Sequence, residues 1–232
     1  MELPILSKNL IYSKMVDKSL MPYSEKIFDL PIKIIQFGEG NFIRAFFDYF
    51  IHRLNCNNLF NGRIAVVKPI KYGNVDKFKK QDCLYTLILT GIESGKKIYK
   101  KEIIPSIGEA LDAYGEWYKI IDYAKNPEVK IIVSNTTEAG IRFVPESKLA
   151  DNPPEGFPAK LTALLYSRYR SNNETKGCII IPLELIEDNG NKLKEIVIKY
   201  VDLWNLEDKF RVWINNKNLF VNTLVDRIVP GY

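Results

Sequence analysis

The segment Ile32–Arg44 reads IKIIQFGEGNFIR. Its apolar start, bounded by Pro31, predicts a short buried strand. After the turn Gly38-Glu39-Gly40-Asn41, apolar residues recur at the spacing of an amphipathic helix over residues 43–54. A second apolar run follows at 64–67. The order strand, glycine-rich turn, helix, strand predicts the first βαβ unit of a dinucleotide-binding fold.

The rest of the chain continues to alternate strands and helices. Glu93-Ser94-Gly95-Lys96 has the central glycine of a two-residue hairpin turn, and it joins strands at 84–92 and 97–104. We also expect strands at 129–133 and 179–181, and helices at 110–124, 157–169 and 191–201. Residues 1–31, interrupted by prolines, are expected to be irregular. The sequence thus predicts an α/β fold: a single Rossmann-like domain over 32–232, with a doubly wound, mostly parallel sheet and a β-hairpin insertion.

Length and composition are those of a folded protein. The chain has 232 residues, of which 46% are hydrophobic and 26% charged, and this excludes an intrinsically disordered chain. No run approaches the ~18 apolar residues of a membrane span, and the amino terminus does not resemble a secretory signal. The separated cysteines Cys56, Cys83 and Cys178 predict neither a disulfide framework nor a zinc site. We therefore expect a cytoplasmic protein that does not bind membranes.

Charge and histidine content exclude further classes of function. The net charge is +5, but the basic residues are scattered, so we expect no nucleic-acid binding. With His52 as the single histidine, histidine-rich metal sites and Ser-His-Asp hydrolysis are not expected, and no metal site is predicted. His52 follows Arg44 and Asp48 at helical spacing, which predicts the polar side of the helix at 43–54.

The glycine-rich turn is the strongest candidate for a cofactor site. Gly38 permits a tight turn out of the strand, and Gly40 lets a pyrophosphate approach the N–H groups at the start of the helix. Candidate cofactor contacts in and around this turn are Phe37, Gly38, Gly40, Asn41 and Phe42. The third glycine of the usual motif is replaced by Ile43. Taken alone, the fragment therefore also fits a purely structural turn.

The residues that would distinguish the two nicotinamide cofactors are ambiguous. The second strand of an NAD-binding unit usually ends in Asp or Glu, which binds the ribose hydroxyls. Here residues 67–74 contain no acid; Lys68 or Lys71 could neutralise a 2′-phosphate, although plain surface lysines fit as well. We expect NAD to bind, with NADP not excluded.

A second polar cluster follows the strand predicted at 129–133. Ser134–Glu138 reads SNTTE and lies where ligands bind in open α/β sheets. Asn135 and Thr136 suit contacts with a ribose or a nicotinamide. Glu138 could relay a proton, or it could serve as a carboxylate at a helix N-terminus.

Five motifs in order resemble those of one known family, over nearly the whole of 34–232. They are FGEGNFIRAF (37–46), SNTTEAGI (134–141), FPAKLT (157–162), IIIPLELIEDNG (179–190) and TLVDRIVPGY (223–232). The chain resembles the mannitol dehydrogenase family of zinc-independent long-chain polyol dehydrogenases. The resemblance implies an NAD-binding Rossmann-type domain, a hydride transfer with a sugar-derived substrate, and a second, mostly helical domain that carries a catalytic lysine in a K-x4-N-x2-H motif.

Two departures from the family pattern affect the expected function. No lysine of this chain falls in the K-x4-N-x2-H motif, so we expect the chain alone to be inactive. Polyol-specific members have an asparagine in an S-C-D-N-L motif, and Leu185 stands in its place here. This favours a member acting on sugar acids. Other family members, and a non-catalytic dinucleotide-binding module, remain alternatives.

The carboxyl-terminal segment would face the second domain. Asp226 and Arg227, with Arg44, would support the site or the domain interface; a buried structural Arg–Asp pair is the alternative for the first two. Apolar side chains crowd this part of the chain at Trp204, Trp213, Phe220 and Val221. We expect them to form an exposed patch through which the chain self-associates.

Overall fold

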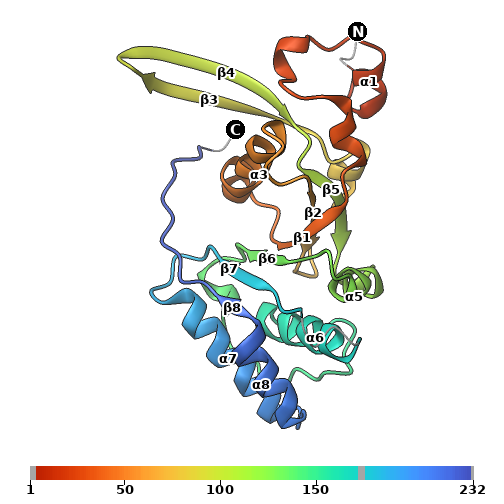
Figure 1. The fold of residues 1–232 in the computed structure, drawn as a ribbon, viewed down its shortest axis with the longest axis vertical. Helices are drawn as coiled ribbons and strands as arrows, with labels where there is room; N and C mark the ends of the chain where they lie inside the picture. The colour runs from red at the N-terminus through yellow and green to blue at the C-terminus, as the bar shows by residue number, and fades with distance from the viewer. Residues whose placement is uncertain (1–3, 172–175, 231–232) are drawn as a thin grey trace.

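A computed structural model describes residues 4–171 and 176–230. Its centre is a six-stranded sheet in the order β5-β2-β1-β6-β7-β8, in which all neighbouring strands are parallel (Figure 1). The strands are β1 (Ile32–Phe37), β2 (Arg63–Lys68), β5 (Ile107–Asp112), β6 (Ile131–Ser134), β7 (Ile179–Pro182) and β8 (Leu219–Phe220). The order reverses between β1 and β6, as in a doubly wound sheet. The predicted fold class is confirmed.

Helices cover both faces of the sheet. One face carries α2 (Asn41–Ala45), α3 (Phe47–Cys56) and α4 (Asp76–Lys80); the other carries α5 (Trp117–Lys125), α6 (Phe157–Arg170), α7 (Asn189–Leu203) and α8 (Asp208–Lys217). Successive residues of β1 alternate between the two cores: Ile34 packs with the α3 side, and Ile35 and Phe37 pack with the α6 side. Because β1 is buried on both faces, its sequence is almost continuously apolar.

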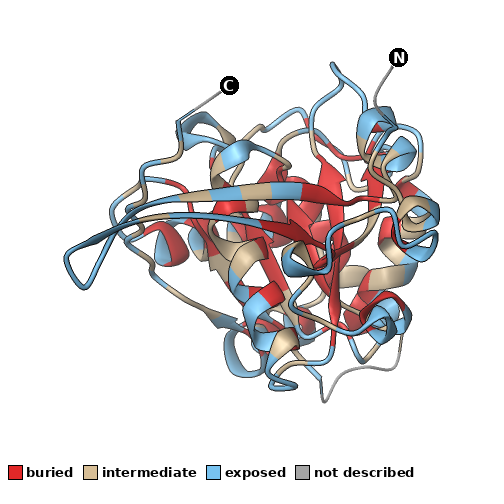
Figure 2. Cartoon of the chain, turned by 90° about the horizontal axis from the view of Figure 1, so that it is seen from above, coloured by how far each residue is buried: buried red, intermediate tan, exposed pale blue. Residues whose placement is uncertain are grey.

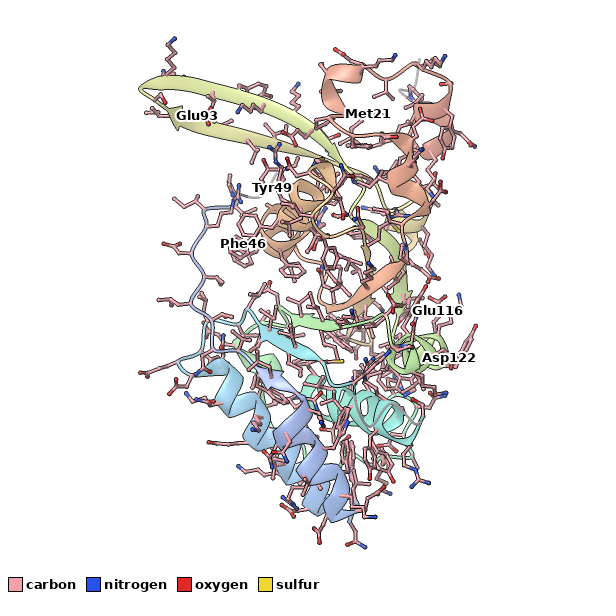
Figure 3. All side chains as sticks on the ribbon, viewed as in Figure 1. Met21, Phe46, Tyr49, Glu93, Glu116 and Asp122 are labelled. Atoms are coloured by element: carbon pink, nitrogen blue, oxygen red, sulfur yellow. The ribbon has the colours of Figure 1, made fainter. Side chains whose placement is uncertain are left out.

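The β-hairpin is confirmed and projects from the body of the molecule (Figures 1 and 2). Strands β3 (Tyr85–Glu93) and β4 (Lys96–Ile104) pair from Tyr85↔Ile104 to Glu93↔Lys96. Both turn residues, Ser94 and Gly95, have positive φ, which matches the twist of a two-residue hairpin. The base is buried and the distal half is exposed. Figure 3 labels Glu93 at the tip.

Residues 4–31 contain short helical turns, where an irregular segment was predicted. They are α1 (Lys8–Tyr12) and the 3-10 turns η1 (Lys18–Leu20) and η2 (Glu25–Asp29). Each begins at a Ser or Asp whose side chain accepts a backbone N–H. Ile11, Ile27 and Phe28 pack against Leu84 and Ile103 at the hairpin base.

Two predicted helices differ in the structure. The helix expected over 110–124 is strand β5 up to Asp112 and helix α5 only from Trp117. The helix expected over 43–54 is broken at Phe46 into α2 and α3. Helix α8 and strand β8 were not predicted. No helix among the described residues is long and apolar enough to cross a bilayer.

The predicted apolar patch at the carboxyl-terminal end is wrong in its residues. Trp213 is 4% exposed and belongs to the core beside Phe210. Trp204 donates from its indole Nε1 to the Ser147 carbonyl at 2.9 Å. Phe220 extends the sheet as part of β8. Helix α8, which was not predicted, contains Trp213 and turns it into the core, whereas Trp204, Phe220 and Val221 are half-buried.

Candidate functional site

Strands β1 and β6 meet at Gly38, at their carboxyl ends. Gly38 has a left-handed φ of +109°, and a β-carbon there would lie 2.5 Å from the Asn135 carbonyl oxygen. The Asn135 N–H donates to the Phe37 carbonyl at 2.9 Å, and the Gly38 N–H donates to the Val67 carbonyl at 3.0 Å. Because both neighbouring strands hold this turn in place, only glycine fits it.

Gly40 leaves an open approach to the start of α2. A β-carbon at Gly40 would meet no atom within 4 Å, and no side chain caps the helix. The first N–H groups of a helix have no intrahelical acceptors, so those at Asn41 and Phe42 can bind an anion. The turn therefore fits the phosphates of a dinucleotide. Since α2 has only five residues, individual N–H groups rather than a long helix dipole would hold them.

Phe37 and Arg44, two other residues predicted around this turn, pack against its surroundings and stabilise it. The Phe37 side chain is fully buried, with its ring centroid 5.1 Å from that of Phe157, so it shapes the turn from behind. The Arg44 guanidinium lies over the rings of Phe78 and Tyr85, at 5.3 and 5.5 Å. The Tyr85 hydroxyl donates to the Arg44 carbonyl at 2.7 Å. Arg44 thereby braces the turn against the hairpin base.

The sequence predicted Arg44, Asp48 and His52 on the polar side of one helix, but Asp48 and His52 are both completely buried. His52 Nε2 lies 3.2 Å from Glu102 Oε2 on strand β4. Burial lowers the pKa of His52, while Glu102 raises it. The break at Phe46 separates Arg44 from the other two residues, and α3 places His52 beside Glu102 of β4 and Asp48 beside Gln36 of β1.

Asp48 lies beneath the glycine-rich turn. The Gln36 amide nitrogen donates to the Gly38 carbonyl at 3.1 Å and to Asp48 Oδ2 at 3.4 Å. Gln36 Oε1 and Asp48 Oδ1 are buried without a partner among the described residues. Burial raises the pKa of Asp48 to about 8, although the Gln36 hydrogen bond and the charge of Arg44 lower it. A neutral Asp48 therefore supports the turn at neutral pH.

This burial predicts a pH dependence of stability. Because the pKa of Asp48 is higher in the folded state than its ordinary 3.8, the native state binds more protons between about pH 4 and pH 8. Stability should fall as the pH rises through that window, by roughly 3 kcal/mol between pH 5 and pH 8. Urea unfolding of the wild type and of Asp48→Asn checks this, since the variant should lose most of the dependence. An equal fall in both would show that another group titrates.

Glu184 holds the polar cluster after β6, and sequence reasoning did not find it. It is 2% exposed and accepts from the Ser134 hydroxyl at 3.0 Å. Its second oxygen accepts from both the N–H and the hydroxyl of Thr136, each at 2.8 Å. In the sequence, Glu184 could have been noticed as an acid between Leu183 and Leu185, directly after the apolar strand that ends at Pro182. Thr136, predicted to contact the cofactor, is thus turned toward Glu184.

A pocket of about 600 Å³ opens at the carboxyl ends of β6 and β7. It brings together five predicted residues from three parts of the chain: Phe42, Asn135, Glu138, Asp226 and Arg227. Asn135 donates from Nδ2 to the Leu183 carbonyl at 3.2 Å. Glu138 begins the 3-10 turn η3 (Glu138–Gly140) and is exposed, so it has the position of a first-turn carboxylate while also lining the pocket.

The carboxyl-terminal segment closes one side of this pocket. Asn189 anchors it, because its side chain accepts the Thr223 N–H at 2.9 Å and donates to the Pro182 carbonyl at 3.1 Å. The Arg227 guanidinium lies over the ring of Tyr49 of α3, 5.6 Å from its centroid; Figure 3 labels Tyr49. Asp226 is exposed, and the described residues contain no Asp226–Arg227 ion pair. The structural-pair alternative is therefore wrong. Gly231 and Tyr232, the end of the motif, lie outside the described residues.

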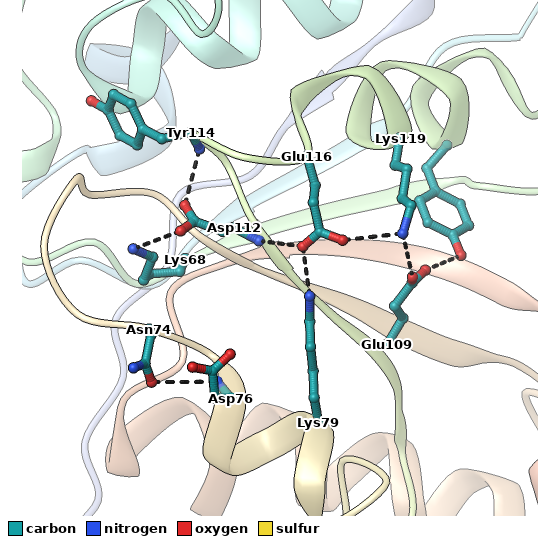
Figure 4. A network of polar contacts seen from close by, with 10 residues as sticks. Lys68, Asn74, Asp76, Lys79, Glu109, Asp112, Tyr114, Glu116 and Lys119 are labelled. Atoms are coloured by element: carbon teal, nitrogen blue, oxygen red, sulfur yellow. Dashed lines mark hydrogen bonds and ion pairs between the residues drawn. The ribbon is translucent and has the colours of Figure 1, made fainter.

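Lys68 and Asp112 are the last residues of β2 and β5, on the far side of β1 from β6 (Figure 4). Lys68 is 1% exposed, and its ammonium lies 3.1 Å from Asp112 Oδ2 and 2.7 Å from the Gly73 carbonyl. Lys68 is therefore neither a surface lysine nor free for a 2′-phosphate. Lys71 is exposed on the loop that follows.

Two solved structures share the fold. Mannitol 2-dehydrogenase of Pseudomonas fluorescens, solved as a ternary complex with NAD and D-mannitol, matches with a TM-score of 0.80 at 22% identity; the match covers 97% of this chain and 47% of that one. A D-sorbitol dehydrogenase in substrate-free form matches with a TM-score of 0.75 at 22% identity, covering 94% of this chain and 46% of that one.

Sequence comparison finds much more similar relatives. Altronate oxidoreductase of Bacillus subtilis (strain 168) is 47% identical over 204 residues, which are 87% of this chain and 42% of that protein. Altronate oxidoreductase of Phocaeicola vulgatus is 47% identical over 204 residues, 87% of this chain and 43% of that protein. The chain thus spans less than half the length of these relatives. The family model of the mannitol dehydrogenase Rossmann domain matches residues 32–232. This chain belongs to the mannitol dehydrogenase family, and the part matched is its Rossmann domain.

Proposed function

We propose that this chain is the NAD(H)-binding part of an altronate oxidoreductase, which transfers a hydride between the nicotinamide and altronate or tagaturonate. The observation that carries the substrate class is the 43–47% identity to altronate oxidoreductases over nearly nine-tenths of the chain. Leu185 in place of the asparagine of polyol-specific members agrees with it. A fructuronate reductase or a mannitol dehydrogenase is the nearest alternative.

The geometry of the glycine-rich turn and the pocket supports a role for each group of residues. The N–H groups after Gly40 would bind the pyrophosphate, and Gly38 keeps the backbone close enough to the sheet for the cofactor to cross it. NAD(H) would supply the hydride chemistry. Asn135 is fixed by its bond to Leu183, so its amide oxygen would orient the nicotinamide carboxamide. Arg227 would attract the carboxylate of a sugar acid, and Glu138 would relay a proton.

We expect the 232-residue chain alone to show background activity with altronate and NAD. None of the described residues that line the pocket is a lysine, and the family's catalytic lysine belongs to a motif that this sequence does not contain. Loss of a general acid–base typically lowers turnover by about 10²–10⁴-fold. A steady-state assay against a full-length altronate oxidoreductase checks this, with NADH binding as the control for an intact site. Turnover within tenfold of the full-length enzyme would place the proton-transfer group in this chain.

Self-association remains part of the proposal, with a different surface. Leu185, Leu224 and Ile228 are 64%, 95% and 92% exposed and lie at or beside the pocket and the extended carboxyl-terminal segment. Such exposed apolar side chains favour self-association of the chain. Sedimentation over a concentration series would detect it.

A cytoplasmic location is also proposed, since all three cysteines are free, as in a reducing compartment.

A further inference from the structure

The acid that usually binds the adenosine ribose is absent from the end of β2, where Lys68 stands. All three ammonium hydrogens of Lys68 have acceptors: Gly73 O at 2.7 Å, Asp112 Oδ2 at 3.1 Å and Tyr72 O at 3.4 Å. Both oxygens of Asp112 also have partners, because Oδ2 pairs with Lys68 and Oδ1 accepts a hydrogen bond from the Tyr114 N–H at 3.0 Å. This pair fastens the loop after β2 to the end of β5 (Figure 4), so neither side chain is available to a ligand.

Glu39 stands one strand away on the same edge of the sheet. Phe37 pairs with Val67, and Lys68 pairs with Asp112, so Glu39, Lys68 and Asp112 follow one another across the carboxyl ends of β1, β2 and β5. Glu39 is half-buried, and no other described residue donates a hydrogen bond to its carboxylate. Burial raises the pKa of Glu39, while Lys68 and Arg44 lower it. Apart from its own backbone N–H, the half-buried Glu39 carboxylate therefore has no donor among the described residues, and its oxygens can accept hydrogen bonds from the hydroxyl groups of a ligand.

We propose that Glu39 accepts hydrogen bonds from the 2′- and 3′-hydroxyls of the adenosine ribose, replacing the missing acid of β2. This assignment rests on the proposed binding of NAD(H) across Gly38 and Gly40. Glu39 lies between these glycines and directly follows β1, which pairs with β2 as far as Phe37↔Val67. A 2′-phosphate would instead meet the charges of Glu39 and Asp112, with the Lys68 charge already neutralised. Glu39 thereby selects NAD(H) over NADP(H).

The test is a calorimetric titration of the folded chain with NADH and, separately, with NADPH. The wild type should prefer NADH by tenfold or more. Glu39→Gln should weaken NADH binding by about tenfold to a hundredfold, because charge-assisted hydrogen bonds are lost. The same substitution should leave NADPH binding unchanged or make it stronger, so that the preference for NADH over NADPH nearly disappears. Glu93→Gln, the same change at the exposed hairpin tip, is the matched control and should bind both cofactors like the wild type.

A second comparison assigns the effect to the ribose. ADP should bind the wild type more tightly than 2′-deoxy-ADP, and Glu39→Gln should bind the two equally. Circular dichroism confirms that the variant is folded. If the folded variant binds NADH as tightly as the wild type, or still discriminates against 2′-deoxy-ADP, the role of Glu39 is wrong while NAD binding stands. If the wild type binds neither cofactor, the proposed function itself fails, and the role of Glu39 with it.

Discussion

Gly38→Ala should destabilise the chain by about 3 kcal/mol or more and abolish measurable NADH binding. The substitution forces a β-carbon into a left-handed backbone at φ +109°, 2.5 Å from the Asn135 carbonyl oxygen. That carbonyl cannot withdraw easily, because the Asn135 N–H is bonded to Phe37 and the next residue is bonded to Glu184. Urea unfolding measures the stability, and calorimetry measures the binding.

Gly40→Ala is the matched control for this prediction. Gly40 has φ −65°, and its β-carbon would enter open space, so stability should change by less than about 1 kcal/mol. The new methyl group would nevertheless stand where the pyrophosphate approaches, and NADH binding should weaken clearly. A Gly38→Ala variant as stable as Gly40→Ala would contradict the account of the turn.

Glu184→Ala should cost about 3–5 kcal/mol. The change leaves the hydroxyls of Ser134 and Thr136 and the Thr136 N–H without their acceptors in a buried place. Glu184→Gln should recover most of the loss, because it keeps the oxygen that Thr136 needs, and the Ser134 hydroxyl can reverse its role. Urea unfolding of both variants, with NADH affinity as second readout, checks the order. Equal stability of all three proteins would show that Glu184 does not hold the loop.

The sequence predicted the parts of the fold that rest on local patterns. Ile32–Phe37 and the following glycines were recognised because apolar runs, glycines and helical spacing are all visible within about twenty residues. The Ser94-Gly95 turn was recognised for the same reason, since both positions tolerate positive φ.

Features that depend on distant partners were missed. Residues 110–112 have the spacing of a helix, yet they pair as β5 with Val66–Lys68, more than 40 residues earlier. Tertiary pairing here overrides a local helical pattern. Lys68 looked like a surface lysine because its acceptors, two carbonyls and Asp112, are brought to it only by the loop and the neighbouring strand.

The candidate site shows the same division. Asn135, Glu138 and Arg227 were chosen from their own segments, and the structure brings them to one pocket. Glu184 was not chosen, because nothing near it in the sequence indicates that its donors lie about 50 residues away. Asn189, which fixes the carboxyl-terminal segment through Thr223, was missed for the same physical reason.

A crystal structure of the chain with bound NADH would show where each part of the cofactor lies. We expect the pyrophosphate at the N–H groups after Gly40, the nicotinamide beside Asn135 and Glu138, and the adenosine ribose at Glu39. Density for NADH across the carboxyl ends of β1 and β6 in that orientation is the expected result. Density elsewhere on the chain, or in the reverse orientation along the same edge, would show that these residues do not bind NADH in this way.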